Sequence, residues 1–120
     1  MTENIEDLVA PQQEHRRFVR RDVKWKVVIK DKARNIIVDA MTINVSEQGT
    51  LIATNEAFKK QQIFPLMIQA RIQEKKLKIY TMAEVRHIVI KKDFFQLGVL
   101  FKQIRPNDQK LLSRFAENII

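Results

Sequence analysis

The sequence predicts an all-β fold with one helix, in which about six antiparallel strands form a closed or nearly closed β-barrel. Three observations predict it. From residue 23 to residue 104 the chain is rich in Val, Ile and Thr, and apolar residues alternate with polar ones in several stretches. Turn-forming residues separate these stretches, as expected for strands that pair with their neighbours. Beyond residue 105 the apolar residues take a helical spacing instead.

Each predicted strand has one face for the core and one face for solvent. Apolar residues at positions 25, 27 and 29 alternate with lysines at positions 24, 26 and 30. Residues 66–73 show the clearest alternation, and a longer alternation covers residues 77–89. His87 keeps the apolar register of the last stretch, which favours a half-buried structural histidine over a catalytic one. The expected turns lie at residues 31–35, 47–49, 73–75 and 91–93.

The two ends of the chain carry other patterns. Residues 1–22 are predicted to form a flexible N-terminal arm, and residues 23–120 to form the barrel and the helix, as one domain overall. The helix is expected to begin at Pro106, because proline is tolerated in the first turn and Asp108 suits the positive end of the helix dipole. The helical face that would cover an open side or end of the barrel consists of Leu111, Leu112, Phe115 and Ile119.

The composition excludes several kinds of site and favours an anionic partner. The 120 residues include no cysteine, which excludes disulfides, thiolate zinc sites and cysteine nucleophiles. The 22 Lys and Arg residues outnumber the 14 Asp and Glu residues, and the net charge of +8 favours nucleic acid, anionic lipid or a nucleotide as partner. The acidic N-terminus and the short apolar runs predict a cytoplasmic protein without membrane insertion.

Enzyme motifs are nearly absent. His15 and His87 are the only imidazoles, and no histidine pair or carboxylate cluster has the spacing of a metal site. With two glycines in total, the chain has no glycine-rich phosphate loop and no G-x-S-x-G motif. We therefore expect no enzymatic activity, no metal and no cofactor.

Two motifs stand out from this background. Residues 14–22 read EHRRFVRRD and contain the pattern R-x-x-x-R. Residues 44–49 have the form N-x-S-x-x-G and connect two predicted strands. Because glycine is so rare here, Gly49 predicts a tight turn that needs a positive φ or a close approach of the backbone. The arginines of the first motif and its neighbours are Arg16, Arg17, Arg20 and Arg21.

These two motifs, in this order within a β-rich chain, resemble the signature of the PilZ domain family. The family pattern is R-x-x-x-R followed by (D/N)-x-S-x-x-G, and residues 98–101 resemble the family's G-x-x-F strand before its C-terminal helix. Asn44 replaces the commoner aspartate, and Thr50 stands where an aliphatic residue is usual. The resemblance implies a six-stranded antiparallel β-barrel with a C-terminal α-helix, and it implies the bacterial second messenger cyclic di-GMP as ligand.

The resemblance also implies which residues bind this ligand. Carried over by position, Arg16 and Arg20 are the ligand arginines, and Arg17 and Arg21 are adjacent candidates. His15 precedes the motif at a position linked in the family to binding of one ligand molecule or of a stacked pair. The implied contacts on the barrel side are Asn44, Ser46 and Gly49.

The arginine cluster suits such a ligand chemically. A guanidinium can pair with a phosphate as a fork, donate to O6 and N7 of guanine, or stack on a purine. Our hypothesis is that repulsion among the arginines keeps the free arm mobile, and that bound ligand draws it onto the barrel. The surface that an unknown downstream protein meets would then change.

Other interpretations compete with this one. A basic β-barrel can bind single-stranded nucleic acid, although one Trp and one Tyr offer few aromatics for base stacking and so disfavour that partner. A PilZ-like adaptor can act without a ligand, although the signature residues are present here. Asn44 and Ser46 would also serve as ordinary turn formers that cap local backbone groups. Phe18 is interpreted as a hydrophobic anchor that docks the arm on the barrel.

Overall fold

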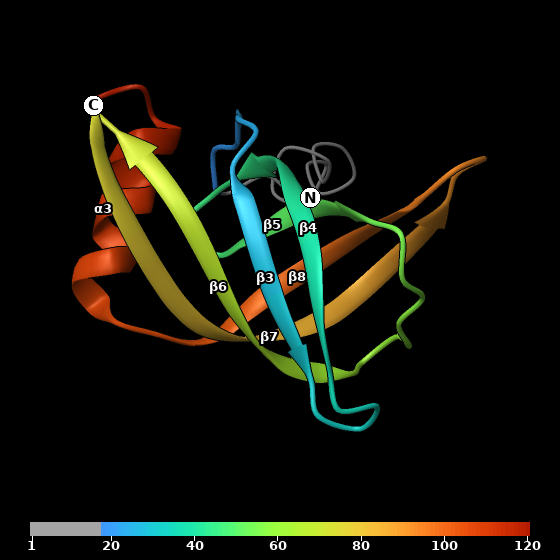
Figure 1. The fold of residues 1–120 in the computed structure, drawn as a ribbon. Helices are drawn as coiled ribbons and strands as arrows, with labels where there is room; N and C mark the ends of the chain where they lie inside the picture. Colours follow the sequence, from blue (N-terminus) through green and yellow to red (C-terminus); the bar gives the residue numbers. More distant parts are fainter. Residues whose placement is uncertain (1–17) are drawn as a thin grey trace, which may run out of the picture.

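The computed structural model describes residues 18–120 (Figure 1). Arg16 and Arg17, and with them the predicted arm as far as residue 17, lie outside the described residues. The elements in chain order are β2 (Arg21–Asp22), β3 (Lys26–Asp31), β4 (Ile36–Val45), β5 (Gly49–Thr54), β6 (Ile63–Ile72), β7 (Lys75–Ile90), β8 (Phe95–Ile104) and α3 (Pro106–Ala116).

The strands form one closed antiparallel barrel. Hydrogen-bonded neighbours follow the order β2-β4-β3-β6-β7-β8-β5, and pairing of β5 with β4 closes the ring. Strands β3 to β8 therefore make a six-stranded barrel, and the predicted fold of a barrel with a C-terminal helix is confirmed. The additional strand β2 has two residues, of which Arg21 pairs with Val45 and Asp22 with Asn44. The sheet thus begins at Arg21, within the segment that the sequence assigns to the arm.

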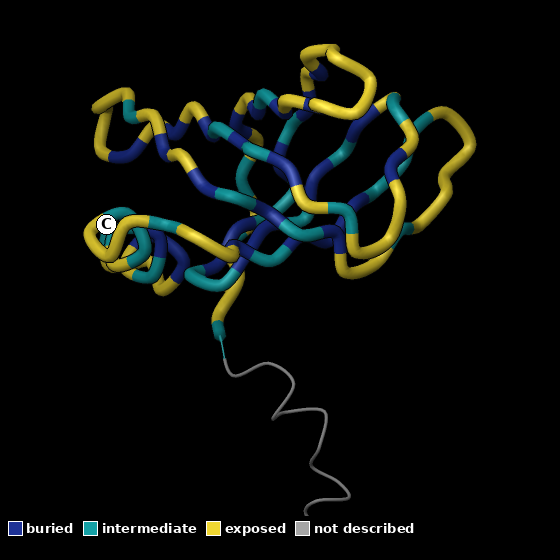
Figure 2. Tube along the Cα trace, turned by 90° about the horizontal axis from the view of Figure 1, so that it is seen from below, coloured by how far each residue is buried: buried dark blue, intermediate teal, exposed yellow. Residues whose placement is uncertain are grey.

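The core lies inside the barrel, on the inward-facing side of each strand. In β3, for example, Val27 and Ile29 are buried, whereas Lys26 and Lys30 on either side are exposed. Figure 2 shows the same alternation along the other strands, with exposed loops at the ends of the barrel. Because each strand buries only one face, a shift of one residue in its pairing would expose its apolar side chains, and this fixes the register.

Helix α3 closes one end of the barrel. Its first residue is Pro106, as the sequence predicts, and its buried side chains include Leu112 and Phe115. The Phe115 ring lies 4.8 Å from the Trp25 ring between centroids, so that the helix is anchored on the residue that precedes β3. Among residues 18–120, no helix is long and apolar enough to span a membrane.

The end of α3 differs from the prediction. Ile119 was expected on the buried face of the helix, but the helix ends at Ala116 and Ile119 is 55% exposed. The reason is a change of backbone direction, since Asn118 has a φ of 62° and the amide of Ile119 bonds back to the carbonyl of Arg114. A residue in the left-handed region after the last turn is a common way to end a helix.

The hairpin between β6 and β7 turns within two residues. Gln73 and Glu74 have φ values of 51° and 65°, and the strands pair up to Ile72 and Lys75. Two successive residues with positive φ are what a type I′ turn requires, a turn that normally carries Asn-Gly. The predicted turn at residues 73–75 is therefore present, although neither central residue is a glycine.

The predicted register of the last part of β7 is wrong. Val85 is buried and pairs with Val99, but the next pair is His87 with Gly98, so Arg86 is an extra residue in the strand. Such a β-bulge moves every following side chain to the opposite face. His87 is consequently exposed instead of half-buried, and it faces a cavity on the outside of the barrel.

Candidate ligand-binding site

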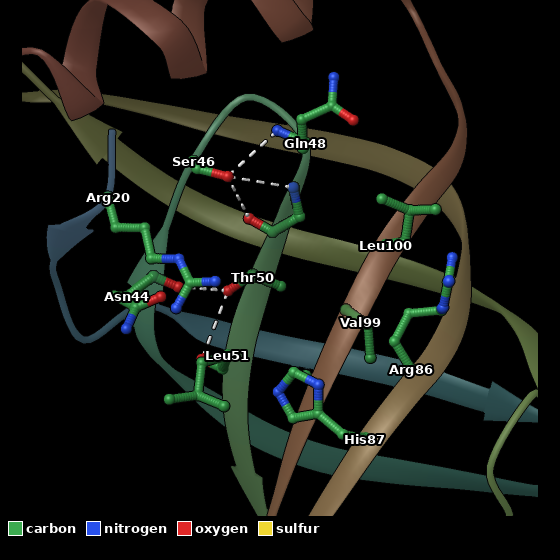
Figure 3. Close-up of a pocket in the computed structure, with 12 residues that line it drawn as sticks. Arg20, Asn44, Ser46, Gln48, Thr50, Leu51, Arg86, His87, Val99 and Leu100 are labelled. Atoms are coloured by element: carbon green, nitrogen blue, oxygen red, sulfur yellow. Dashed lines mark hydrogen bonds between the residues drawn. The ribbon is translucent and has the colours of Figure 1, made fainter. Parts of the chain in front are cut away.

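A cavity of about 170 Å³ lies where the start of β2 and the β4–β5 turn meet the outer side of β7 and β8 (Figure 3). It brings together four residues that the sequence separates into two motifs: Arg20, Asn44, Ser46 and Gly49. The other lining residues are Gln48, Thr50, Leu51, Arg86, His87, Gly98, Val99 and Leu100.

The β4–β5 turn is held by the side chain of Ser46. Its Oγ accepts hydrogen bonds from the amides of Gln48 at 3.1 Å and Gly49 at 3.3 Å, and the Ser46 amide donates to the Gly49 carbonyl at 2.9 Å. The spacing S-x-x-G is thus the spacing that closes this turn. Because Ser46 is buried and its hydroxyl bonds within the turn, its main role is to shape the turn that borders the cavity.

Gly49 is required by a close approach and not by its backbone angle. Its φ is not positive, but a Cβ placed on it would lie 2.1 Å from the carbonyl oxygen of Val99 on the neighbouring strand β8. Of the two explanations that the sequence offers for this glycine, the structure selects close packing against the backbone. The β4–β5 turn can therefore lie flat against β8 at the floor of the cavity.

Thr50 explains how Asn44 is positioned. The Thr50 hydroxyl is buried and donates a hydrogen bond of 2.6 Å to the carbonyl of Asn44 across the β4–β5 pair. A register shift between Thr42 and Asn44 bends β4 at the same place. Asn44 is half-buried on the cavity wall, and the bond from Thr50, where the family usually has an aliphatic residue, fixes its backbone.

The two adjacent arginines at the start of the sheet point to different places. Arg20 is exposed and extends into the cavity toward Asn44 (Figure 3). Arg21 turns away, and its Nη1 donates to the carbonyl oxygens of Phe115 at 3.0 Å and Ile120 at 2.9 Å. Its guanidinium lies over the Phe115 ring, 4.0 Å from the centroid. The structure therefore brings Arg20 to the cavity and places Arg21 outside it.

Phe18 lies beside this entry to the sheet. It is half-buried and lines a small hollow together with Glu47 of the β4–β5 turn and with Ser113 and Ala116 of α3. This position agrees with its interpretation as a hydrophobic anchor.

Two residues at the cavity were not identified from the sequence. Arg86 and His87 are both exposed, and the β-bulge in β7 directs them to the rim that faces the β4–β5 turn. A Cβ on Gly98 would lie 2.3 Å from the Nε2 atom of His87, so the imidazole packs directly on the backbone of β8. The rarity of glycine could have indicated this contact, because Gly98 sits in a strand, where a glycine often marks close approach of another group.

The cavity has a cationic character. Arg20 and Arg86 line it, whereas no Asp or Glu is among its lining residues. Neither guanidinium forms an ion pair with another residue of the described part of the chain. Two unpaired guanidinium groups around amide and hydroxyl groups favour an anionic, hydrogen-bonding ligand. Within residues 18–120, no group of His, Asp or Glu is arranged to hold a metal ion.

Comparison with known proteins agrees with this fold. The family model described as PilZ domain matches residues 14–118. No curated protein matches the chain. Several solved structures are similar in fold, and the three described next are each less than 25% identical in sequence.

The first of these structures is the inhibitor of motility MotI/DgrA of Bacillus subtilis, with a TM-score of 0.78 and 21% identity over 87% of this chain and 50% of that one. The second is YcgR of Escherichia coli in complex with c-di-GMP, with a TM-score of 0.72 and 15% identity over 87% and 45%. The third is the PilZ domain of YcgR with c-di-GMP, with a TM-score of 0.67 and 16% identity over 86% and 89%. The chain thus spans about half the length of the first two proteins.

Proposed function

Because this chain belongs to the PilZ domain family, we propose that it is a receptor for cyclic di-GMP and that the cavity beside the β4–β5 turn is its binding site. The observation that carries the proposal is the convergence of Arg20 with Asn44, Ser46 and Gly49 around one cationic cavity. In support, two of the similar structures are described as complexes with c-di-GMP.

Different lining residues can bind different parts of the ligand. Cyclic di-GMP carries two phosphodiester charges and two guanines, and a guanidinium binds either group through paired N–H donors. Arg20 and Arg86 lie on opposite sides of the cavity, and in this view the imidazole of His87 lies between Leu51 and Arg86 (Figure 3). We assign a guanine to this space, where the Asn44 amide can both donate and accept.

The size of the cavity is the basis for the part that we propose for the first motif. A volume of about 170 Å³ is below the ~300–1,000 Å³ of pockets that enclose a whole small molecule. The ligand would therefore project beyond the described residues. We propose that Arg16, and beside it Arg17, cover the projecting phosphodiester from the segment that leads into Arg20.

Ligand binding would affect the rest of the protein through β2. Arg20 contacts the ligand in this proposal, and the next residue, Arg21, holds the end of α3 through the carbonyls of Phe115 and Ile120. A ligand that shifts the backbone at Arg20 would thereby act on α3. We propose that this change is passed to a downstream protein, so that the chain acts as a receptor and not as an enzyme.

Calorimetric titration with cyclic di-GMP tests the proposal, with GTP as a control ligand. Arg16→Ala/Arg20→Ala should weaken binding by at least about ten- to a hundredfold, the amount expected for losing hydrogen bonds from charged groups. Arg71→Ala is the matched control, because Arg71 is an exposed arginine on the far strand β6. A folded wild-type protein that does not bind cyclic di-GMP, or that binds GTP equally well, would contradict the proposal.

A further inference from the structure

An apolar groove crosses the outer face of the barrel over β3, β4, β6 and β7, and none of the residues that line it lines the ligand cavity. It has a volume of about 530 Å³. Exposure is high for side chains of this kind, since Ile37 is 63% and Tyr80 is 56% exposed. The residues that form this apolar outer face are Val28, Ile37, Pro65, Met67, Tyr80 and Met82.

The pairing of strands makes this face continuous. Val28 of β3 pairs with Met67 of β6, and Met67 pairs with Tyr80 of β7. Two residues nearer to α3 along the same strands, the outward-facing row is Lys26, Gln69 and Lys78, which is the polar row that an outer face normally carries. The change from this polar row to an apolar one is therefore local. Contiguous exposed apolar residues, and Tyr and Met among them, are typical of interaction surfaces.

The charges around the groove indicate its occupant. Lys30 lines it, and Lys26 and Lys78 flank it. None of the three lysines forms an ion pair with a residue in the part of the chain that the structure describes. Two acidic residues lie nearby: Asp39 pairs with Val28 on the neighbouring strand β4, and Glu84 of β7 forms an ion pair with Lys102 at 3.4 Å. The unpaired charge at this face is thus mainly positive.

Two alternative occupants fit this arrangement less well. A second copy of the chain would bring two faces of the same positive charge together, and such like charges disfavour association. A lipid bilayer is met by protruding apolar side chains, whereas these residues line a groove. The closed barrel also leaves no free edge here on β3, β6 or β7 to which a further strand could be added.

We propose that this apolar outer face docks a protein partner through an acidic segment, in which one large aliphatic or aromatic side chain enters the groove and flanking Asp or Glu residues pair with Lys26, Lys30 and Lys78. The downstream partner would thus be recognised through its acidic segment. That such a partner exists rests on the proposed function. The docking face is separate from the cavity at the β4–β5 turn, so the two can be tested apart.

Selection from a displayed library of random peptides tests the proposal. The immobilised full-length protein is the bait, and peptides that also bind Met67→Glu/Tyr80→Glu are removed. The expected peptides carry a large apolar residue next to Asp or Glu. Synthetic copies should bind the wild-type protein at least about tenfold more tightly than Lys30→Glu/Lys78→Glu, which changes the charge and leaves the groove intact. Lys110→Glu, a charge reversal at an exposed position on α3, is the matched control and should bind like the wild type.

Several results would overturn the proposal. They are the absence of peptides that depend on this face, enrichment of basic peptides, sedimentation of the protein with phosphatidylglycerol vesicles in a Tyr80-dependent way, and dimerisation that Tyr80→Glu abolishes. Titration of the same variants with cyclic di-GMP separates the two proposals. Peptide binding without nucleotide binding would contradict only the receptor function, and nucleotide binding without peptide selection would contradict only the docking face.

Discussion

The guanidinium of Arg21 stacks on the ring of Phe115, 4.0 Å from its centroid, and joins the first strand of the sheet to the last turn of α3. The same guanidinium donates to the carbonyl of Phe115, an acceptor at the negative end of the helix, and to the carbonyl of Ile120, four residues beyond the helix. Its neighbour Arg20 reaches the ligand cavity instead. Arg20 of the motif and the adjacent Arg21 thus have different surroundings, because successive side chains of an extended chain point to opposite sides.

Arg20 and Arg21 should therefore differ in what their loss affects. Arg21→Ala removes two hydrogen bonds from a charged group and a ring contact, and we expect the free energy of unfolding to fall by about 1.5–3 kcal/mol. Arg20→Ala should leave stability nearly unchanged and weaken cyclic di-GMP binding. Urea denaturation and calorimetry of both variants check this. Loss of nucleotide binding without loss of stability in Arg21→Ala would contradict the division.

The two glycines should also respond differently to alanine. In Gly49→Ala the new Cβ meets the Val99 carbonyl, which belongs to the backbone and cannot move aside, and a loss of about 1–3 kcal/mol is expected. In Gly98→Ala it meets the imidazole of His87, an exposed side chain that can rotate away. Stability should then change little, while cyclic di-GMP binding weakens because His87 leaves its place. Thermal unfolding and calorimetry of the two variants distinguish these effects.

A control separates crowding from other effects of Gly98→Ala. The double variant Gly98→Ala/His87→Ala has no imidazole for the new methyl group to displace. If His87 binds the ligand, the double variant should bind no more tightly than His87→Ala alone. A Gly98→Ala variant with wild-type affinity would show that the position of the imidazole does not matter for binding.

The β6–β7 turn offers a stabilising substitution. Glu74 has a φ of 65°, a conformation that costs an L-residue roughly 1–2 kcal/mol and that glycine adopts freely. Glu74→Gly should raise the free energy of unfolding by about 0.5–1 kcal/mol after the larger chain entropy of glycine is subtracted. Thermal unfolding measures the gain. Lys76→Gly, two residues farther in strand β7, is the matched control and should destabilise the protein.

Acid stability should depend on Asp31. The hydrogen bond from the Arg34 side chain, 2.6 Å from Nε to Oδ2, lowers the pKa of Asp31 below its ordinary value of 3.8, although burial acts in the opposite direction. A lowered pKa means that the stabilisation is complete above that ordinary value and is lost as the pH falls through the pKa of the folded state. Urea denaturation between about pH 5 and about pH 2 should show this loss in the wild type and a smaller one in Asp31→Asn. Asp93→Asn, at an exposed position, serves as control and should retain the wild-type profile.

Local patterns were sufficient to predict the barrel, the start of α3 and the turn that carries Ser46 and Gly49. Each depends on residues close together in the chain, such as the alternation in β3 or the proline that begins the helix. Arg86 and His87 were missed because a β-bulge depends on how β7 pairs with β8, and alternation along one strand does not contain this information. The separate role of Arg21 likewise depends on Phe115, which is 94 residues away in the chain.

The bond from Arg21 to the carbonyl of Ile120 has a consequence for how this unit can be combined with others. It joins the first strand of the sheet to the last residue of the chain, so the two ends of the described barrel lie on the same side. A domain with neighbouring ends can be inserted into a surface loop of another protein. It can also be circularly permuted, with its ends joined by a short linker and new ends made in another loop. Neither rearrangement would require the chain to pass through the barrel.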